Sequence, residues 1–324
     1  MTKPPSIQFS IIVPVYNRPD EIRELLVSLY RQTYKDFEVI VVDDGSAVLA
    51  EKATRDFMDK LKLRYFYKEN TGPGLSRNYG MERATGNYFI ILDSDVLIPS
   101  EYMQIVADNL HHHFVDAYGG PDAAAENFTS FQKAVNFAMT SFLTTGGIRG
   151  KGKSLEKFNP RSFNMGISKE VFKKTGGFSD MRYGEDIDLS IRIRKSGFKT
   201  ALFKNAFVYH KRRTNIRSFF NQIKHSGTAR VALWKKYPDS LKWVHLFPVL
   251  FLFGLILSIL LSLAGIYIGL GFYVAYFVLL GVVAFFHYKQ IKLAFLSALA
   301  SFVMLTAYGW GFLTALFKQK KKVI

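Results

Sequence analysis

Apolar runs of strand length alternate with helical patterns over the first hundred residues of the chain. The runs that predict strands cover residues 7–15, 37–42, 63–67 and 88–92. Helices are predicted by the helical spacing of Ile22, Leu25, Leu26 and Leu29, and further along near residues 48–60, 75–84 and 102–113. This alternation predicts an α/β fold with a doubly wound, mostly parallel sheet, in which ligands bind at the carboxyl ends of the strands.

The last quarter of the chain is apolar almost throughout. Residues 245–286 carry no charged side chain, and because roughly 20 apolar residues span a bilayer, this run predicts two helices at about 245–264 and 266–286. A third apolar segment covers residues 293–317. A buried helix hairpin in a soluble protein is the alternative, and the length of the uncharged run disfavours it. We therefore expect a first domain at 1–240 and an all-α transmembrane region with two or three helices at 241–324.

The positions of the lysines predict an orientation in the membrane. Lys235, Lys236 and Lys242 precede the apolar run, as juxtamembrane basic residues do, so the first domain is expected in the cytoplasm. The connection at 289–292 then returns to the cytoplasm, and a third span would put the lysines after residue 317 outside, against the positive-inside rule. Either the rule is broken there, or the third segment lies along the interface or re-enters it. With both alternatives open, we expect a multi-pass protein of the inner (plasma) membrane.

The net charge and the amino-acid composition give limited information about what this protein binds. The formal net charge of +17 is attracted to anionic membranes, phosphorylated ligands and nucleic acid alike. The lysines beside the apolar run favour a membrane, so no nucleic-acid partner is expected. The absence of cysteine excludes a disulfide framework and a thiolate metal site. The short apolar stretch near the N-terminus has no small-residue cleavage site and is interpreted as a strand, not as a signal peptide.

Two acidic pairs are candidates for chemistry. Asp93 and Asp95 follow the strand at 88–92 directly, at a sheet edge where a hard cation such as Mg²⁺ or Mn²⁺ and a diphosphate can be held. An acidic turn after a strand is also ordinary loop structure. Glu185 and Asp186 open a predicted amphipathic helix, where they either complement the helix dipole or supply a general base.

Seven motifs occur in the order and spacing typical of one enzyme family. They lie at 14–17, 42–46, 72–78, 92–95, 164–166, 176–178 and 185–186. With these motifs the chain resembles a family 2 glycosyltransferase of the A-type fold over residues 7–235. The resemblance implies transfer of a sugar, with inversion, from a UDP- or GDP-linked donor with Mn²⁺ or Mg²⁺ as cofactor. The Gln-x-x-Arg-Trp motif of processive synthases is absent after Gln222, which disfavours a processive synthase.

The resemblance also implies roles in nucleotide binding. Pro14 and Tyr16 would line the pocket for the base, and Asp44 would accept a hydrogen bond from the base. Arg77 would lie near the base and the phosphates. Asp93 would approach the ribose or the metal.

Further roles concern the metal and the catalytic step. Asp95 would ligate the metal, Asp186 would be the catalytic base, and Glu185 would orient the acceptor hydroxyl. His210 ends a predicted strand, where it would supply a further metal or phosphate contact or be structural. The three histidines at 111–113 are interpreted as a solvated helix end, because adjacent helical residues point in different directions.

Three features leave alternatives. The basic residues at 211–213 would either contact lipid headgroups or hold the diphosphate. The glycine- and lysine-rich stretch at 146–153 predicts a loop, either a lid or a disordered segment. The apolar helices favour a membrane-associated or lipid-linked acceptor in cell-surface polysaccharide or glycolipid assembly. A polyprenyl-phosphate sugar synthase and a catalytically inactive nucleotide-sugar-binding membrane protein are the rivals.

Overall fold

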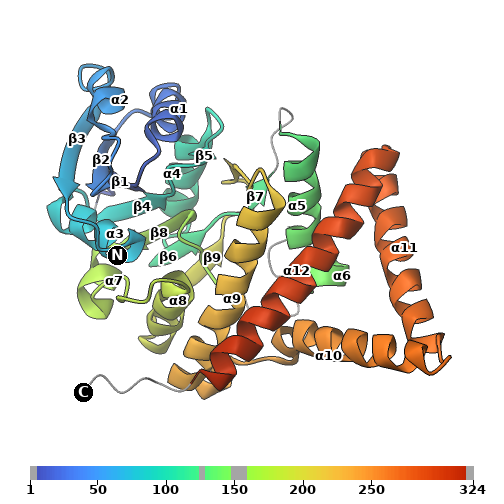
Figure 1. The fold of residues 1–324 in the computed structure, drawn as a ribbon. Helices are drawn as coiled ribbons and strands as arrows, with labels where there is room; N and C mark the ends of the chain where they lie inside the picture. Colours follow the sequence, from blue (N-terminus) through green and yellow to red (C-terminus); the bar gives the residue numbers. More distant parts are fainter. Residues whose placement is uncertain (1–5, 124–127, 147–158, 319–324) are drawn as a thin grey trace. The chain divides into compact units, whose positions relative to one another are not determined.

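The computed structural model describes residues 6–123, 128–146 and 159–318, and it divides into two compact units (Figure 1). We call Met1–Ala123 with Phe158–His210 the sheet unit, and Ala124–Lys157 with Lys211–Ile324 the helical unit. The expected functional division at residue 240 stays a prediction, because this grouping follows contacts only. Of the loop expected at 146–153, only Gly146 lies within the described residues.

The sheet unit alternates strands and helices as the sequence predicted. In chain order its elements are β1 Phe9–Val15, α1 Pro19–Tyr30, β2 Phe37–Asp44, α2 Glu51–Arg55, β3 Lys62–Lys68, α3 Pro73–Arg83, β4 Tyr88–Leu92, β5 Val96–Leu97, α4 Tyr102–His112, β6 Ala117–Gly119, β7 Asp122–Ala123, β8 Asn164–Ser168, α7 Lys169–Thr175, α8 Glu185–Lys195, β9 Thr200–Leu202 and β10 Val208–His210. The helix expected at 48–60 is shorter, because after Arg55 the chain continues in tighter i→i−3 turns.

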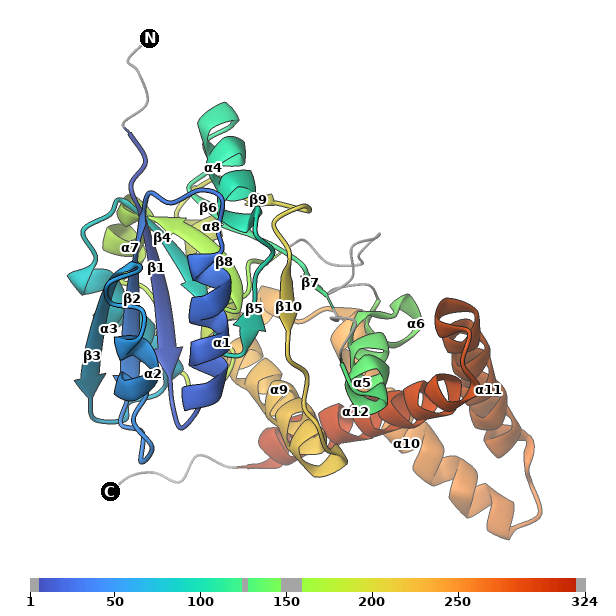
Figure 2. The ribbon, with the colours of Figure 1, turned by 90° about the horizontal axis from the view of Figure 1, so that it is seen from above.

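Seven strands form the main sheet in the order β3-β2-β1-β4-β8-β6-β9, and only β8 runs antiparallel to its neighbours (Figure 2). The predicted doubly wound, mostly parallel sheet is thereby confirmed. The carboxyl ends of β1, β2 and β4 meet at one edge, and residues 16, 44 and 93–95 lie at or just after those ends.

Helices cover both faces of this sheet, which explains why β1, β2 and β4 are apolar at most positions, on both faces. Ile11 and Val13 belong to the core shared with Leu25 and Leu26 of α1. Ile12 faces the opposite way and belongs to the core shared with α3, α7 and α8. Gly80 of α3 lets that helix approach closely, since an added Cβ would lie 2.7 Å from Cγ2 of Ile12.

A second, three-stranded sheet has the order β5-β10-β7. Here β10 pairs antiparallel with β5, so His210 lies opposite Val96, the residue after Asp95. It pairs parallel with β7 on its other side, where Val208 lies opposite Asp122. This small sheet is the element that joins residue 210 to the acidic turn after β4.

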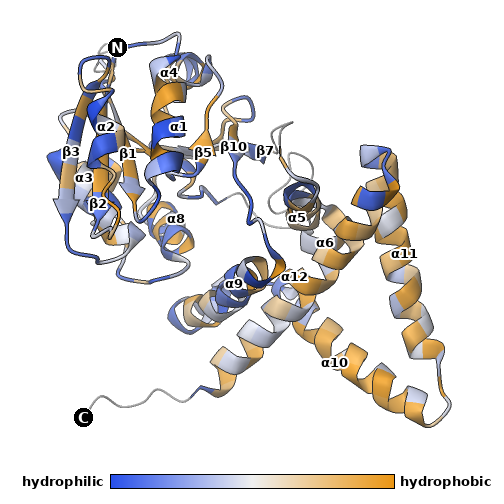
Figure 3. Ribbon diagram, turned by 45° about the horizontal axis from the view of Figure 1, so that its top comes forward, coloured by the Kyte–Doolittle hydropathy of each residue, from blue (hydrophilic) through white to orange (hydrophobic). Residues whose placement is uncertain are grey.

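The helical unit contains the apolar helices that the sequence predicted. Its elements are α5 Ser130–Thr140, α6 Phe142–Thr145, α9 Ile216–Lys236, the 3₁₀ turn η1 Pro238–Ser240, α10 Trp243–Leu263, α11 Ile268–Tyr288 and α12 Ile291–Phe317. Colouring by hydropathy marks α10 and α11 as apolar along nearly their whole length (Figure 3). Each of α10, α11 and α12 is long and apolar enough to cross a membrane.

Helix α12 lies at the centre of the helical unit. It packs against α5, α9, α10 and α11. Its contact with α9 is close at Gly311, where an added Cβ would lie 2.0 Å from the carbonyl oxygen of Lys224. Half of the most apolar 18-residue stretch of α12 is buried, compared with 11% of the corresponding stretch of α11. Its mean hydropathy is also the lowest of the three, 1.7 against 2.7 for α10 and 2.3 for α11, as expected for a helix that faces protein more than the other two do.

Candidate functional site

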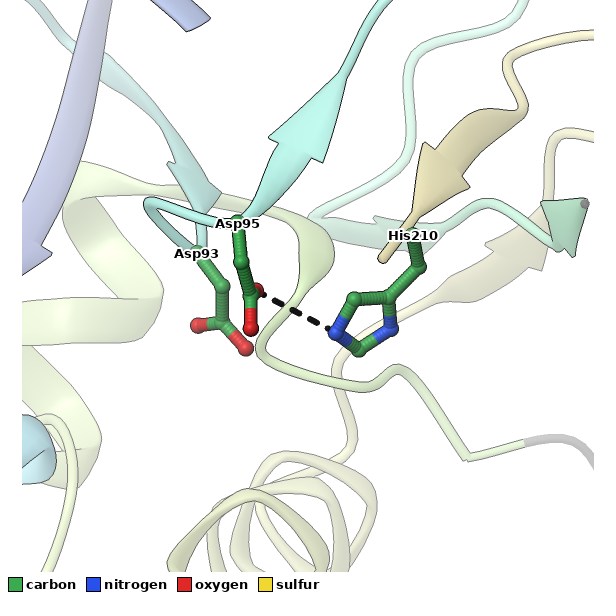
Figure 4. A group of neighbouring side chains, drawn as sticks. All are labelled: Asp93, Asp95 and His210. Atoms are coloured by element: carbon green, nitrogen blue, oxygen red, sulfur yellow. Dashed lines mark ion pairs between the residues drawn. The ribbon is translucent and has the colours of Figure 1, made fainter. Parts of the chain in front are cut away.

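The acidic turn after β4 forms a cluster with the last residue of β10. Figure 4 shows Asp93, Asp95 and His210 with their side chains turned toward one another. One potential ligand atom from each lies within 4.8 Å of the others. The turn is closed by a hydrogen bond from the amide of Val96 to the carbonyl oxygen of Asp93, 3.3 Å long, which holds both carboxylates at this edge of the sheet.

Asp95 is surrounded by cationic groups. Its Oδ2 accepts a hydrogen bond from Nη1 of Arg18, and Nε2 of His210 lies 3.3 Å from its Oδ1. Burial by itself would raise the pKa of Asp95, but His210 and Arg18 outweigh it and hold that pKa below its usual range. Asp95 is therefore an anion in a setting that attracts positive charge.

His210 lies between two carboxylates. Its Nδ1 lies 3.8 Å from Oδ2 of Asp122 on β7, while its Nε2 faces Asp95. A carboxylate on the far side of an imidazole fixes the orientation of the ring in many metal sites. Oxygen ligands from Asp93 and Asp95 suit Mg²⁺ or Mn²⁺, and His210 adds one nitrogen. The cluster therefore fits a divalent cation.

Arg77 joins the two acidic pairs that the sequence singled out. It is 3% exposed, and its Nη2 donates to Oδ1 of Asp93 at 2.6 Å while its Nη1 donates to Oε1 of Glu185 at 2.9 Å. Its guanidinium also lies 5.1 Å from the ring centroid of Phe178. Burial opposes the charge, but the two carboxylates outweigh it and raise the pKa of Arg77. By bridging the two carboxylates, Arg77 connects the start of α8 to the carboxyl end of β4.

The two residues that open α8 have different surroundings. Glu185 is buried, and this burial together with the charge of Asp186 raises its pKa to about 7, although Arg77 acts in the opposite direction. The Oδ1 of Asp186 accepts a hydrogen bond from the amide of Ile187, and its Oδ2 lies 3.6 Å from Nη1 of Arg161. Asp186 is thus the more accessible of the two carboxylates.

The residues expected to bind the nucleotide lie at the ends of β1 and β2. Pro14 is buried inside β1, whereas Tyr16 just beyond that strand is 50% exposed. The Oδ1 of Asp44 accepts from Nζ of Lys68 at 2.6 Å and from the amide of Thr71, and its Oδ2 accepts from the amide of Gly72. Asp44 therefore ties the loop after β3 to the end of β2.

The family of this chain is identified by its match to a family model. The model of the family described as "Glycosyl transferase family 2" matches residues 10–176, which is more than half of the chain. The chain belongs to this family. It is a glycosyltransferase. Glu185, Asp186 and His210 lie beyond the matched segment, so their roles stay predictions.

Two relatives whose names give an activity match this chain over part of their length. The glycosyltransferase GlyA of Streptococcus pneumoniae is 34% identical over 129 residues, which is 39% of this chain and 18% of GlyA. The poly(ribitol-phosphate) β-N-acetylglucosaminyltransferase TarS of Staphylococcus aureus is 36% identical over 114 residues, 34% of this chain and 20% of TarS. The matched segments thus span well under half of these relatives.

Two solved structures share the fold. The mannosyltransferase PcManGT of Pyrobaculum calidifontis, in complex with GDP-Man and Mn²⁺, has a TM-score of 0.65 and 18% identity and covers 96% of this chain and 87% of its own. A TarS structure in complex with UDP has a TM-score of 0.51 and 19% identity and covers 91% of this chain and 90% of its own. The central sheet with flanking helices is therefore the A-type fold of glycosyltransferases.

Four residues that the sequence did not single out contact the predicted site residues. They are Arg18, Lys68, Asp122 and Arg161, which contact Asp95, Asp44, His210 and Asp186 respectively. Only Arg18 carried a local signal, because it directly follows the motif at 14–17. The histidines at 111–113 are exposed at the end of α4, which agrees with their interpretation as a solvated helix end.

The raised pKa of Glu185 predicts a pH dependence of stability. Its pKa lies near 7 in the folded protein against an ordinary 4.5, so the folded state holds this proton more tightly than the unfolded state. The free energy of unfolding should therefore contain a component that is present below pH 4.5 and is lost as the pH rises to about 7. Glu185→Gln should remove this component, measured as the change in Tm between pH 5 and pH 8 in detergent. Glu170→Gln, at an exposed position of α7, should keep the wild-type slope, and an equal slope in both variants would contradict the assignment.

Proposed function

We propose that this glycosyltransferase moves a sugar, with inversion, from a UDP- or GDP-linked donor to a membrane-associated acceptor. The observation that supports this best is that Arg77 bridges two carboxylates, those of Asp93 and Glu185. It joins the edge of the sheet where such folds bind nucleotides to the helix start that carries Asp186. The guanidinium of Arg77 therefore contacts both Asp93, on the side proposed for the donor, and Glu185, on the side proposed for the acceptor.

The donor and its metal ion would be bound by residues at the ends of four strands, β1, β2, β4 and β10. Tyr16 offers a half-exposed ring for stacking on the base, beside Pro14 and Asp44. Asp93, Asp95 and His210 would hold Mn²⁺ or Mg²⁺, which when bound neutralises the charge of the diphosphate leaving group. GDP-Man and UDP occur in the complexes of PcManGT and TarS, which supports both donor classes without choosing between them.

Asp186 would act as the general base. In a single displacement the acceptor oxygen bonds to the anomeric carbon as the bond to the diphosphate breaks, and Asp186 takes the proton of the acceptor hydroxyl. Its side chain remains 16% exposed, and Nη1 of Arg161 lies 3.6 Å from its Oδ2. An accessible carboxylate at this helix start can reach the acceptor hydroxyl, as a general base must. Glu185 is buried against Arg77, and this supports a role in positioning Asp186 and the acceptor hydroxyl.

The acceptor is proposed to be lipid-linked or otherwise at the membrane, in cell-surface polysaccharide or glycolipid assembly. Three helices with the length and apolarity of membrane spans support this, and a polyprenyl-phosphate sugar synthase is the alternative within the same class. We further propose that the sheet unit lies in the cytoplasm and the chain in the inner (plasma) membrane. The basic residues before α10 support that orientation.

The function is tested by release of nucleoside diphosphate from UDP- and GDP-sugars by the detergent-purified protein, with Mn²⁺ or Mg²⁺ and with a chelator. Metal-dependent release from one donor is expected, and it names the donor. Binding of UDP or GDP with no release in the presence of polyprenyl phosphate or membrane lipid extract would instead favour a catalytically inactive nucleotide-sugar-binding protein.

Arg18 provides a separate prediction about the metal site. Its guanidinium neutralises Asp95, the carboxylate that a divalent cation would need. We expect Arg18→Gln to tighten binding of Mn²⁺ several-fold in the absence of nucleotide, measured by the electron paramagnetic resonance signal of free Mn²⁺. Arg23→Gln removes an exposed arginine of α1, the helix that begins directly after Arg18, where Arg23 pairs with Asp56. This variant should leave the affinity unchanged. Weaker Mn²⁺ binding in Arg18→Gln would contradict this competition.

A further inference from the structure

An apolar groove runs between α11 and α12 in the helical unit. Its volume is about 380 Å³, and it is lined by Val278, Gly281, Val282, Phe285, Phe286, Ile291 and Ala294. Every one of these residues is apolar, and several remain largely exposed, including Phe286 at 64% and Ile291 at 79%. Within helices of spanning length, such a groove opens to lipid and suits a hydrocarbon chain.

The groove owes part of its depth to a glycine. An added Cβ at Gly281 would meet only the carbonyl oxygen of Ala294, at 3.9 Å, so the space beside the backbone here is not filled by a neighbouring side chain. The lining runs along α11 from Val278 to Phe286, about 12 Å at the rise of an α-helix. This is less than half of a hydrocarbon core roughly 30 Å thick, so the groove takes the part of a lipid chain nearest its headgroup.

Two lysines lie at the end of the groove where α11 passes into α12. Lys289 caps α11 in the left-handed region at φ +56°, and its Nζ lies 4.9 Å from the ring centroid of Phe286. Lys292 is exposed in the first turn of α12, one residue after Ile291. Figure 3 marks this connection as a hydrophilic end on two apolar helices.

The charge of these lysines is not balanced by any acidic residue nearby in the sequence. The last acidic residue of the chain is Asp239. Among the described residues, neither Lys289 nor Lys292 forms an ion pair. Cationic side chains at the end of a membrane helix attract anionic headgroups. The apolar groove therefore suits the hydrocarbon chain of a lipid, and the two lysines at its end suit an anionic headgroup.

We propose that this groove binds an anionic diacyl phospholipid, with its phosphate between Lys289 and Lys292 and one acyl chain along α11. The site is separate from the residues proposed for sugar transfer, all of which belong to the sheet unit. The proposal therefore does not depend on the proposed reaction. It assigns a specific lipid ligand to a hairpin that is otherwise described only as a pair of candidate membrane spans.

The test is native mass spectrometry of the full chain in detergent, titrated with phosphatidylglycerol or phosphatidylcholine. Phosphatidylglycerol should be retained in preference, and Lys289→Gln with Lys292→Gln should lower its affinity by about tenfold. Lys173→Gln with Lys174→Gln removes the same charge from exposed positions of α7 in the sheet unit and should leave the affinity unchanged. Equal retention of both lipids by the wild type, or equal loss in both double variants, would overturn the proposal.

A second pair of variants tests the groove itself. Gly281→Leu should fill it and weaken retention of phosphatidylglycerol. Gly271→Leu makes the same change on the same helix, at a position where an added Cβ meets nothing within 4 Å, and should have no effect. Inorganic phosphate should compete poorly, because it lacks the chain. Unchanged retention in Gly281→Leu, or displacement of the lipid by millimolar phosphate, would overturn the site.

Discussion

Asp186→Asn is expected to reduce kcat by roughly 10²- to 10⁴-fold while leaving the KM for the nucleotide-sugar donor unchanged. The amide keeps the shape of the side chain at the start of α8 and can still accept the hydrogen bond from the amide of Ile187. It cannot take a proton from the acceptor hydroxyl. The loss should therefore fall on the chemical step, as measured by steady-state release of the nucleoside diphosphate.

The matched control for this variant is Asp180→Asn. Asp180 is exposed in the loop that leads into α8, so the substitution removes the same charge six residues earlier in the chain. It should have near wild-type turnover. Near-normal turnover in Asp186→Asn as well would remove Asp186 from the role of base, whereas a rise in donor KM without loss of kcat would assign it to donor binding instead.

Asp95→Asn is expected to weaken Mn²⁺ binding by more than the roughly 10- to 100-fold that loss of an outer-shell partner costs. Asp95 is one of the two carboxylates of the cluster, and its Oδ1 faces Nε2 of His210, so its loss removes a proposed ligand together with its negative charge. Metal-dependent binding of UDP or GDP should fall with it. Titration calorimetry with and without Mn²⁺ measures both quantities without turnover.

Asp36→Asn serves as the control for Asp95→Asn. Asp36 lies just before β2 with its side chain 74% exposed and paired with Lys62. Its substitution should leave Mn²⁺ affinity and nucleotide binding unchanged. If Asp95→Asn bound Mn²⁺ as tightly as this control, the cluster of Asp93, Asp95 and His210 would not be the metal site.

The elements that the sequence predicted well are those that depend on local pattern. Strands β1 to β4 follow from short, mostly apolar runs. In β1, β2 and β4 these runs reflect burial on both faces of the sheet. The three long helices α10 to α12 follow from runs without charge and agree with the expected spans to within a few residues. The acidic turn at Asp93 and Asp95 was also visible, because it follows a strand directly.

Several features of the site could not be predicted in this way. The sequence favoured Arg77 as a neighbour of the base and phosphates, but did not indicate that it pairs with Glu185, 108 residues away. Nor did it indicate the burial of Glu185, which comes from packing around α8 and which raises its pKa. Lys68, Asp122 and Arg161 carried no local signal, because single charged residues in loops or short strands have no distinctive pattern.

The sequence by itself determined the alternation of strands and helices, the apolar C-terminal region and the order of the motifs, since each depends on residues close together in the chain. Only the tertiary structure decided which side chains meet. His210 reaches Asp95 because β10 pairs with β5, and Arg77 reaches Glu185 because α3 and α8 cover the same face of the sheet. Such contacts depend on strand pairing and helix packing between distant segments, and the periodicity of a single segment carries no information about them.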